Sequence, residues 1–363
     1  MSTTTPGPGP AADDSLASAR SRFTHCAESG LLRHALAQEY GGRGDGFQEL
    51  VAAHESLGLQ SRDSGLLLAI NAHLWGAVFP LLQFGSEQQR QDWLPALVSG
   101  AHIGGHAITE PDAGSDVGAM RTTATATEHG YRLQGHKRYI TNAPQADVLV
   151  VYARDAAGSQ LSAYLVRVDD AGVEFVDGPG VQGCATAPMG DVLLDDCELP
   201  AARLLGRPGA GAIMIQLALE RERALVFAGI TGVMQWQLQH VIDYVQARPI
   251  GAGLLGDVQV IAHRIADMKL RLETSRLWVT ECARLLDAGQ RITVASAQAK
   301  LYASEAFLQS SLDAAHILGA AGLAGELPRL VQDAMAGRLL SGSSEVQKNI
   351  IAAMLGVGGR RRK

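Results

Sequence analysis

The stretch YRLQGHKRYIT, residues 131–141, combines aromatic and β-branched residues with short polar and apolar alternation, which is typical of a β-strand. Similar runs surround it, and turn-forming Gly, Pro and Asp residues separate them. These runs are TTATAT (122–127), DVLVVYA (147–153), LSAYLVRV (161–168) and DVLLDD (191–196). We therefore predict an all-β unit over residues 104–206.

Helical patterns lie on both sides of this β unit. Apolar residues recur at helical spacing over residues 17–103, as in FQELVAAHESLGL, and again over residues 207–357. Helices, then strands, then long helices indicate an α+β fold and not the strand-helix alternation of a doubly wound sheet. No GxGxxG motif opens a βαβ unit, so a nicotinamide-binding Rossmann domain is not expected. Residues 1–16 have the composition of a disordered lead, and residues 358–363 that of a flexible tail.

The composition is that of a soluble globular protein. The 363 residues carry a net charge of -6, whereas nucleic-acid binders usually present a basic face. The four cysteines are far apart and form no CxxC pair, so we predict neither a metal site nor a disulfide framework, and a reducing cytoplasm is favoured. No basic segment precedes an apolar stretch, and no charge-free span long enough for a membrane helix is expected. The sequence thus predicts a cytoplasmic protein that binds neither membrane nor nucleic acid.

Three polar stretches stand out as candidate ligand contacts. HAITEPDAGSD (106–116) and KRYITNAPQAD (137–147) lie at the edges of the β unit and supply hydroxyl groups and backbone donors, although each alone is also explained as a capped turn. The third, SGSSEVQKNIIAAML (341–355), begins a helix, for which we predict Ser344 as the N-cap and Gln347 as its capping-box partner. A helix N-terminus that follows small residues is open to an anion or a polar ligand edge.

Taken together, five motifs resemble the ordered signatures of the acyl-CoA dehydrogenases. In chain order they are AQEYGGRG, FGSEQQRQDWLPAL, ITEPDAGSD, GHKRYITNA and GSSEVQKNIIA. The resemblance extends from about Phe23 to Leu355. It implies an N-terminal helical domain, a middle β-barrel domain and a C-terminal four-helix bundle, with FAD bound between the last two domains and across a subunit interface. A homodimer or homotetramer is therefore also implied.

The same resemblance implies flavin and substrate contacts at matching positions. The flavin contacts expected in the β unit are His106, Ile108, Thr109, Ser115, Tyr139, Ile140 and Thr141. The residues expected to reach the flavin of a neighbouring subunit are Arg248, Gln259, His316, Gly319 and Ala320. Further cofactor contacts are expected at Ser343 and Glu345, and substrate contacts at Ser115, Arg223, Ser341 and Gly342. The chain has Gly251 and Ala252 where the family usually has an aromatic residue and a glycine, so weaker FAD retention is expected.

The family's reaction removes an α-proton and a β-hydride, so it needs a carboxylate on the face of the substrate opposite the flavin. Many members carry this glutamate directly before the glycine of the last motif, where this chain has Ser341. The isovaleryl-type members instead carry it on the long helix after the barrel, and alignment of IMIQLALERERALVFAGITGVMQ (213–235) puts Glu222 at that location. Helical spacing supports the assignment, because Glu222 shares an apolar face with Ile215 and Gly229, and we expect room for a ligand beside Gly229.

We therefore predict an FAD-dependent dehydrogenase that introduces an α,β double bond into an acyl thioester, with Glu222 as the base. A first alternative is the same chemistry on an acyl or aminoacyl group tethered to a carrier protein in secondary metabolism. Others are a flavin oxidase or monooxygenase on the same fold, and a flavin-binding or assembly protein without activity, since Ser341 replaces the commonest base. The structural alternative for Glu222 is an ion pair with Arg221 or Arg223 in a surface network. The expected partners are a thioester of CoA or of a carrier protein, and an electron-transfer flavoprotein or another acceptor.

Overall fold

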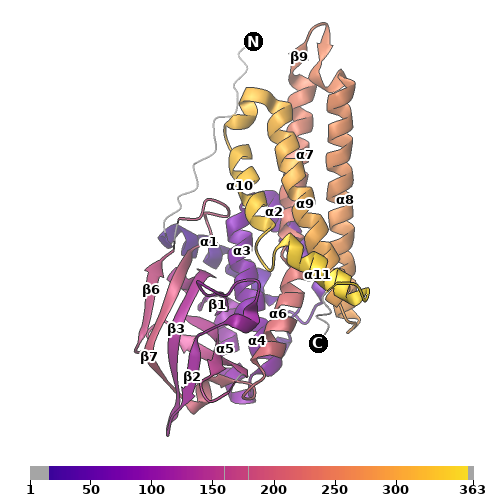
Figure 1. The fold of residues 1–363 in the computed structure, drawn as a ribbon. Helices are drawn as coiled ribbons and strands as arrows, with labels where there is room; N and C mark the ends of the chain where they lie inside the picture. The colour runs from indigo at the N-terminus through magenta and orange to yellow at the C-terminus, as the bar shows by residue number, and fades with distance from the viewer. Residues whose placement is uncertain (1–15, 159, 179, 359–363) are drawn as a thin grey trace.

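The computed structural model describes residues 16–358, apart from residues 159 and 179. Helices, a β domain and a second group of helices follow one another along the chain. In Figure 1 the sheet lies on one side of the N-terminal helices, while three long C-terminal helices run side by side above them. The predicted α+β order is therefore confirmed. The predicted disordered lead, up to residue 15, and the flexible tail, from residue 359, lie outside the described residues.

The N-terminal part is helical. Its elements are α1 (Leu16–Glu28), 3-10 turns at Leu31–Arg33 and Gln38–Tyr40, α2 (Phe47–Ser61), α3 (Ser64–His73), a π-helical turn (Leu74–Val78), α4 (Phe79–Phe84) and α5 (Glu87–Ser99). Short polar side chains begin two of these helices. Asp63 accepts a hydrogen bond from the Leu66 N–H at the start of α3. Ser86 accepts one from the Gln89 N–H at the start of α5, and Gln89 Oε1 accepts one from the Ser86 N–H, which completes a capping box.

The continuous helical stretch Ser64–Phe84 corrects one prediction. It spans 21 residues with a hydropathy of 1.6 and contains no Asp, Glu, Lys or Arg, so the chain does contain a charge-free span of membrane length. However, 94% of its most apolar window is buried inside the protein. Neighbouring elements cover this helical stretch on nearly all sides. It therefore has no solvent-facing side that would require polar residues. It is the core helix of the N-terminal part.

The β domain is one eight-stranded sheet. Its strands are β1 (Gly104–Ala107), β2 (Thr123–Ala126), β3 (Gly130–Thr141), β4 (Val148–Asp155), β5 (Leu161–Arg167), β6 (Val173–Asp177), β7 (Met189–Pro200) and β8 (Leu204–Leu205). The strand order is β6-β7-β3-β2-β4-β5-β8, and β1 pairs in parallel with β4. The middle domain predicted as a barrel is thus a sheet with β6 and β8 at the two ends of its order. Each of the five runs that predicted strands overlaps one of these strands and extends at most one residue beyond it at either end.

A β-bulge interrupts the pairing of β3 with β7 at one of the candidate flavin segments. Between Lys137 and Ile140, β3 contains one more residue than the facing segment of β7. Tyr139 takes a left-handed backbone conformation there, with φ of 56°. Its N–H donates to Asp191 Oδ1 at 3.2 Å and its side chain is exposed. The bulge therefore turns the Tyr139 ring out of the sheet and towards a ligand or solvent.

The C-terminal part consists mainly of helices. They are α6 (Gly211–Leu225), α7 (Ala228–Ala247), α8 (Gln259–Asp287), α9 (Thr293–Leu318), α10 (Leu327–Gly337) and α11 (Ser344–Met354), with a hairpin of β9 (Pro249–Ile250) and β10 (Gly253–Leu254) between α7 and α8. The single helix predicted over residues 213–235 is two helices, because the chain bends at Val226 and Phe227. The ring of Phe227 is buried against Gly337, so the bend directs a large side chain into the core.

Glycines let α2 and α7 cross in close contact. An added Cβ at Gly58 would lie 1.8 Å from the Gly229 carbonyl oxygen, and one at Gly232 would lie 2.0 Å from the Glu55 carbonyl oxygen. Leu67 of α3 occupies the space beside Gly229, where an added Cβ would lie 2.3 Å from a Leu67 methyl carbon. The prediction that Gly229 leaves room for a ligand is therefore wrong, because this glycine serves helix packing. One buried apolar cluster extends through all three parts of the chain.

Candidate active site

Three chain segments meet at Glu222. This residue lies on α6, is 5% exposed, and carries its carboxylate between two other segments. Ser341, in the loop between α10 and α11, donates its hydroxyl to Glu222 Oε1 at 2.6 Å. His106, on β1, places Nε2 3.8 Å from Glu222 Oε2. The structure thus brings together three residues that the sequence assigned to the base, the substrate and the flavin.

The loop that carries Ser341 is tied to both neighbouring helices. Ser341 and Gly342 take left-handed backbone conformations, with φ of 56° and 91°. The Ser341 carbonyl accepts a hydrogen bond from Arg223 Nε at 3.1 Å. Gln347 Nε2 donates to the Gly342 carbonyl at 2.8 Å. Arg223 on α6 and Gln347 on α11 therefore hold the loop from two sides.

The N-cap of α11 is Ser343, whereas the sequence predicted Ser344. Ser343 accepts a hydrogen bond from the Val346 N–H at 3.4 Å. The Ser344 hydroxyl instead donates to Glu305 Oε1 on α9 at 2.7 Å. Gln347, the predicted capping-box partner, uses its amide to bind loop carbonyls. The prediction failed because Glu305, 39 residues away, binds the Ser344 hydroxyl, while Gln347 binds carbonyls of the loop directly before the helix.

A second buried glutamate, Glu220, lies on the same helix but is engaged elsewhere. Its Oε1 accepts hydrogen bonds from the Thr293 hydroxyl at 2.8 Å and from Gln216 Nε2 at 3.4 Å. Glu222, by contrast, keeps Oε2 buried without a hydrogen-bond partner. Burial lowers the pKa of the neighbouring Arg223, and the charges of Glu222 and Glu220 oppose that effect. Glu222 is therefore not part of a surface ion-pair network, and its second oxygen is available to a ligand.

The segment after β1 is fixed from within the sheet. The Thr109 carbonyl accepts a hydrogen bond from the Arg138 N–H at 2.8 Å. The buried Glu110 accepts from Lys137 Nζ at 2.8 Å and from the Thr122 N–H at 3.0 Å. Burial lowers the pKa of Lys137 to about 8, although its bond to Glu110 opposes the effect. Sequence reasoning missed this ion pair, for which a lysine placed within a strand was the only available signal.

The other predicted flavin contacts of the β domain differ in exposure. Ile108 and Ile140 are buried, Thr141 is half-buried, and Ser115 and Tyr139 are exposed. The Arg138 guanidinium lies over the Tyr139 ring, 5.2 Å from its centre. An added Cβ at Gly105 would lie 3.0 Å from the Thr141 carbonyl oxygen, so β1 passes close to the end of β3. The two candidate flavin segments are consequently neighbours in space.

A small, mainly apolar cavity of about 20 Å³, roughly enough for one water molecule, lies at the end of α6, and Glu222 is not among the residues that line it. It is enclosed mainly by α3, α7, α9 and α10. Among its lining residues, Val226 follows Glu222 by one helical turn and Leu340 directly precedes Ser341. Asp333, also in the lining, accepts from the Cys184 N–H at 2.6 Å, and burial raises the pKa of its carboxyl. This space is far smaller than a ligand pocket, so it does not by itself mark an acyl site.

Five of the predicted flavin contacts lie at the other end of the C-terminal helices. They are Arg248, Gln259, His316, Gly319 and Ala320, all exposed. The Tyr244 hydroxyl donates to the Leu318 carbonyl at 3.4 Å, which joins the ends of α7 and α9. Figure 1 shows the β9–β10 hairpin at the end of these helices that points away from the sheet. Within one chain, the structure does not bring these five residues to Glu222.

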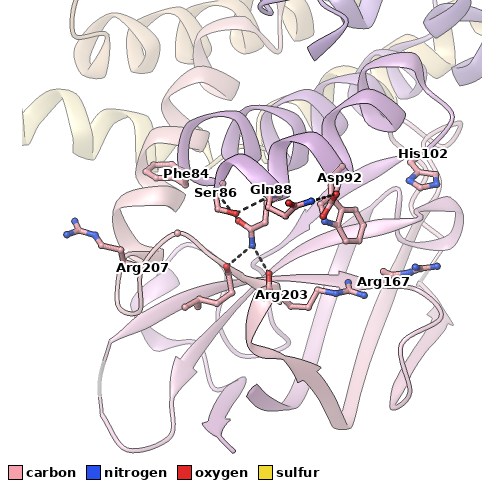
Figure 2. Close-up of a pocket in the computed structure, with 14 residues that line it drawn as sticks. Phe84, Ser86, Gln88, Asp92, His102, Arg167, Arg203 and Arg207 are labelled. Carbon is pink, nitrogen blue, oxygen red and sulfur yellow. Dashed lines mark hydrogen bonds between the residues drawn. The ribbon is translucent and has the colours of Figure 1, made fainter. Parts of the chain in front are cut away.

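A larger cavity, of about 660 Å³, lies between α5 and the segment after β7 (Figure 2). Gln89 Nε2 donates to the carbonyls of Ala202 and Leu204 at 2.8 and 2.9 Å, which ties α5 to this segment. The Arg203 guanidinium lies over the Trp93 ring, 5.1 Å from its centre. The residues that line this cavity include none of the predicted site residues. We therefore place the candidate active site at Glu222, on the chemistry of its side chains and not on cavity size.

Known proteins match the chain along nearly its whole length. Residues 10–101 match the N-terminal domain of acyl-CoA dehydrogenases, residues 105–197 the middle domain, and residues 209–356 the C-terminal domain. The chain belongs to the acyl-CoA dehydrogenase family. Its family and fold class, both predicted from the sequence, are thereby confirmed.

Individual members of the acyl-CoA dehydrogenase family show the same relationship. An L-prolyl-[peptidyl-carrier protein] dehydrogenase of Pseudomonas fluorescens is 37% identical over 336 residues, which cover 91% of this chain and 88% of that protein. The crystal structure of the prolyl acyl carrier protein oxidase AnaB has a TM-score of 0.91 at 34% identity and covers 93% of this chain and 91% of its own. The structure of PigA with FAD and proline has a TM-score of 0.90 at 32% identity, with coverage of 96% and 95%.

The residues at the candidate site leave polar groups free for a cofactor or a ligand. Buried side-chain atoms without a hydrogen-bond partner include His106 Nδ1, Glu222 Oε2 and Gln347 Oε1. They come from β1, α6 and α11, the three elements that meet at the site. Because buried polar groups are normally satisfied, such atoms require partners from solvent or from a ligand. The N-terminus of α11 adds a favourable environment for a polar or anionic group.

Proposed function

We propose that this protein is an FAD-dependent dehydrogenase that introduces an α,β double bond into an acyl thioester, with Glu222 as the base. One observation carries the proposal: a buried carboxylate with one unpartnered oxygen lies between the loop before α11 and His106 on β1. FAD, when bound, supplies the acceptor for the β-hydride. The α-proton goes to Glu222, so the two hydrogens lost by the substrate are both accounted for.

The loop at Ser341 activates the substrate in this proposal. A serine hydroxyl is a poor base at neutral pH, so Ser341 does not replace the glutamate that many family members carry there. Its backbone N–H, or that of Gly342, instead donates to the thioester carbonyl, because any residue but proline supplies this donor. Polarisation of the carbonyl acidifies the α-carbon that faces Glu222. Arg223 supports the loop through its bond to the Ser341 carbonyl.

Two sets of residues are proposed to hold the flavin. The proximal set, in the β domain and at the start of α11, is His106, Ile108, Thr109, Ser115, Tyr139, Ile140, Thr141, Ser343 and Glu345. The distal set, at the far end of the helices, is Arg248, Gln259, His316, Gly319 and Ala320. Since the distal set lies away from Glu222 within one chain, we propose that it contacts the flavin of a second copy. The active protein is then a homodimer or homotetramer.

We propose that the acyl group is an aminoacyl group, such as prolyl, carried on a carrier protein. This proposal is supported by the L-prolyl carrier-protein dehydrogenase and by AnaB, which cover most of this chain. The test compares prolyl and simple acyl groups, each loaded on a carrier protein and on CoA, with an artificial electron acceptor. Mass spectrometry should show loss of two hydrogen atoms from the carrier-bound prolyl group. Equal turnover of the CoA thioesters would contradict the carrier-protein assignment while leaving the dehydrogenase assignment intact.

The base is tested with Glu222→Gln, which keeps the shape of the side chain but removes its proton-accepting charge. We expect turnover to fall at least about a hundredfold, the usual range for loss of a general base, while the flavin absorbance stays with the protein. Glu220→Gln is the matched control, because it changes a second buried glutamate on the same helix, and it should keep most of the activity. Unchanged turnover in Glu222→Gln would show that the base lies elsewhere.

A flavin oxidase is the second candidate, because AnaB is named an oxidase. Anaerobic photoreduction followed by exposure to air separates the two functions. Slow reoxidation without peroxide supports a dehydrogenase, whose acceptor we propose is an electron-transfer flavoprotein or a similar protein. Rapid reoxidation with stoichiometric peroxide supports the oxidase. We further propose a reducing compartment such as the cytoplasm, because Cys26, Cys184, Cys197 and Cys282 are free and buried.

A further inference from the structure

The position that carries a glutamate in many family members is occupied here by a serine that binds the relocated base. Ser341 Oγ lies 2.6 Å from Glu222 Oε1, well within hydrogen-bond distance. The two residues are 119 positions apart in the sequence, and Glu222 lies on α6 whereas Ser341 lies in the loop between α10 and α11. An ionised carboxylate only accepts hydrogen bonds, so the serine hydroxyl is the donor.

The serine is placed by a rigid part of the loop. Its φ of 56° is uncommon for a residue with a side chain, which indicates that the surrounding structure determines it. Arg223 binds its carbonyl at 3.1 Å. Lys300, which is fully buried, binds the Arg338 carbonyl at the start of the same loop at 3.0 Å. The hydroxyl therefore has little freedom to leave Glu222.

The two oxygens of Glu222 have different surroundings. Oε1 accepts the hydrogen bond from Ser341, whereas Oε2 is buried and has no hydrogen-bond partner. His106 Nε2 lies 3.8 Å from Oε2, which is too long for a hydrogen bond. One oxygen is thus occupied by the protein and the other is left free on the side of β1.

We infer that Ser341 is a positioning residue for the base. Its hydroxyl holds Oε1 of Glu222, so that Oε2 accepts the α-proton of the substrate. The inference rests on the proposed function, because it assigns a role in the same reaction. The serine keeps the carboxylate in one orientation and stabilises its charged form before the substrate arrives. The serine at this position therefore not only occupies less space than a glutamate but also binds the base.

The charged groups around Glu222 are few and mostly engaged. His106 on β1 faces Oε2, and Arg223 on α6 binds the loop carbonyl. Glu220, also on α6, accepts from Thr293, and Lys300 on α9 is directed at the loop backbone. The Ser341 hydroxyl is consequently the group whose removal changes the hydrogen bonding of Glu222 most directly.

The test is the kinetics of Ser341→Ala with the thioester that wild type oxidises fastest. We expect kcat to fall about tenfold to a hundredfold, the range for loss of one hydrogen bond to a charged group, with KM within about threefold of wild type. The acid limb of the kcat/KM profile should move to higher pH, because the lost bond stabilised the charged carboxylate. Ser341→Cys, which keeps a weak donor, should show an intermediate kcat.

Thr293→Val is the matched control, because it removes a hydroxyl-to-glutamate hydrogen bond of similar length, at 2.8 Å to Glu220 on the same helix as Glu222. It should keep kcat and the pH profile of wild type. If Ser341→Ala folds poorly, Ser341→Gly removes the same hydroxyl at a backbone conformation that glycine adopts readily, and the same kinetic changes are expected.

A crystal structure of Ser341→Ala supplies a readout that does not depend on turnover. The Glu222 carboxylate should occupy a new or a divided orientation, whereas wild type should show one orientation bound to Ser341. A variant with wild-type kcat, pH profile and Glu222 orientation would overturn this inference alone. A wild-type protein that oxidises none of the thioesters would overturn the proposed function, and this inference with it.

Discussion

The buried ion pair between Lys137 and Glu110 offers a quantitative test of how the flavin segments are held. Lys137 is fully buried on β3, and its Nζ donates to Glu110 Oε1 at 2.8 Å and to the Ile108 carbonyl at 3.2 Å. The pair links the segment after β1 to β3, the two stretches proposed to lie along the flavin. Its loss should therefore affect both stability and flavin binding.

We predict that Lys137→Met destabilises the protein by about 3 kcal/mol. Removal of one partner from a buried ion pair costs about 3–5 kcal/mol, because the other charge is left unpaired. Glu110 keeps hydrogen bonds from the N–H groups of Arg121 and Thr122, which places the loss near the lower end of that range. Methionine approximately fills the volume of the lysine stem, so a cavity adds little.

The assay is thermal unfolding with and without FAD. At about 2 °C per kcal/mol for a long chain, Tm should fall by about 6 °C, and FAD should dissociate more easily from the variant. The double variant with Lys137→Met and Glu110→Gln should recover part of the loss, since it no longer buries an unpaired charge. A Tm within about 1 °C of wild type, or a double variant less stable than Lys137→Met, would refute the reasoning.

Acidification gives an independent check of the same pair. Burial tends to raise the pKa of Glu110, but hydrogen bonds from Lys137, Thr122 and Arg121 outweigh it and the net pKa is lowered. A carboxyl whose pKa is lower in the folded protein stabilises it above the ordinary value of 4.5, and this contribution is lost as the pH falls below it. The Tm difference between wild type and Lys137→Met should therefore narrow below about pH 4.5.

Two further predictions concern the helices. Burial lowers the pKa of Lys300 from 10.5 to about 8, so the unfolded chain binds one proton more than the folded protein between these pH values. As the pH rises from 8 to 10.5, the free energy of unfolding of the wild type should therefore increase relative to that of Lys300→Met. A Tm difference that stays constant across this window would contradict the assignment. Gly232→Ala should lower stability by about 1–3 kcal/mol, because the added Cβ meets the α2 backbone 2.0 Å away, whereas Gly180→Ala, with open space around it, should change little in chemical denaturation. Equal stability of the two glycine variants would mean that α2 and α7 separate without cost.

Much of the fold could be predicted because its signals are local. The alternation in β3 and the helical spacing on either side depend only on neighbouring residues, and each corresponds to an observed element. The family motifs are also short, and the family profiles confirm what they indicated. Glu222 was selected from one helix, and its burial agrees with its predicted apolar face.

The errors arose where distant segments compete with local patterns. Ser344 has the local features of an N-cap, but Glu305 on another helix binds its hydroxyl. Gly229 suggested open space, but Leu67 fills it from another helix. The stretch Ser64–Phe84 is long and apolar enough for a membrane helix, but the surrounding elements of the protein bury it. In each case the deciding partner lies far away in the sequence.

The sequence by itself determined the order of helices and strands, the family, and the absence of a glutamate before Gly342. Only the tertiary structure decided that Ser341 binds Glu222 and that His106 lies on its other side. The physical reason is that secondary structure follows from contacts within a few residues, whereas an active site depends on how whole elements pack. A periodic pattern shows which face of a helix is buried, but it does not specify which side chains meet that face.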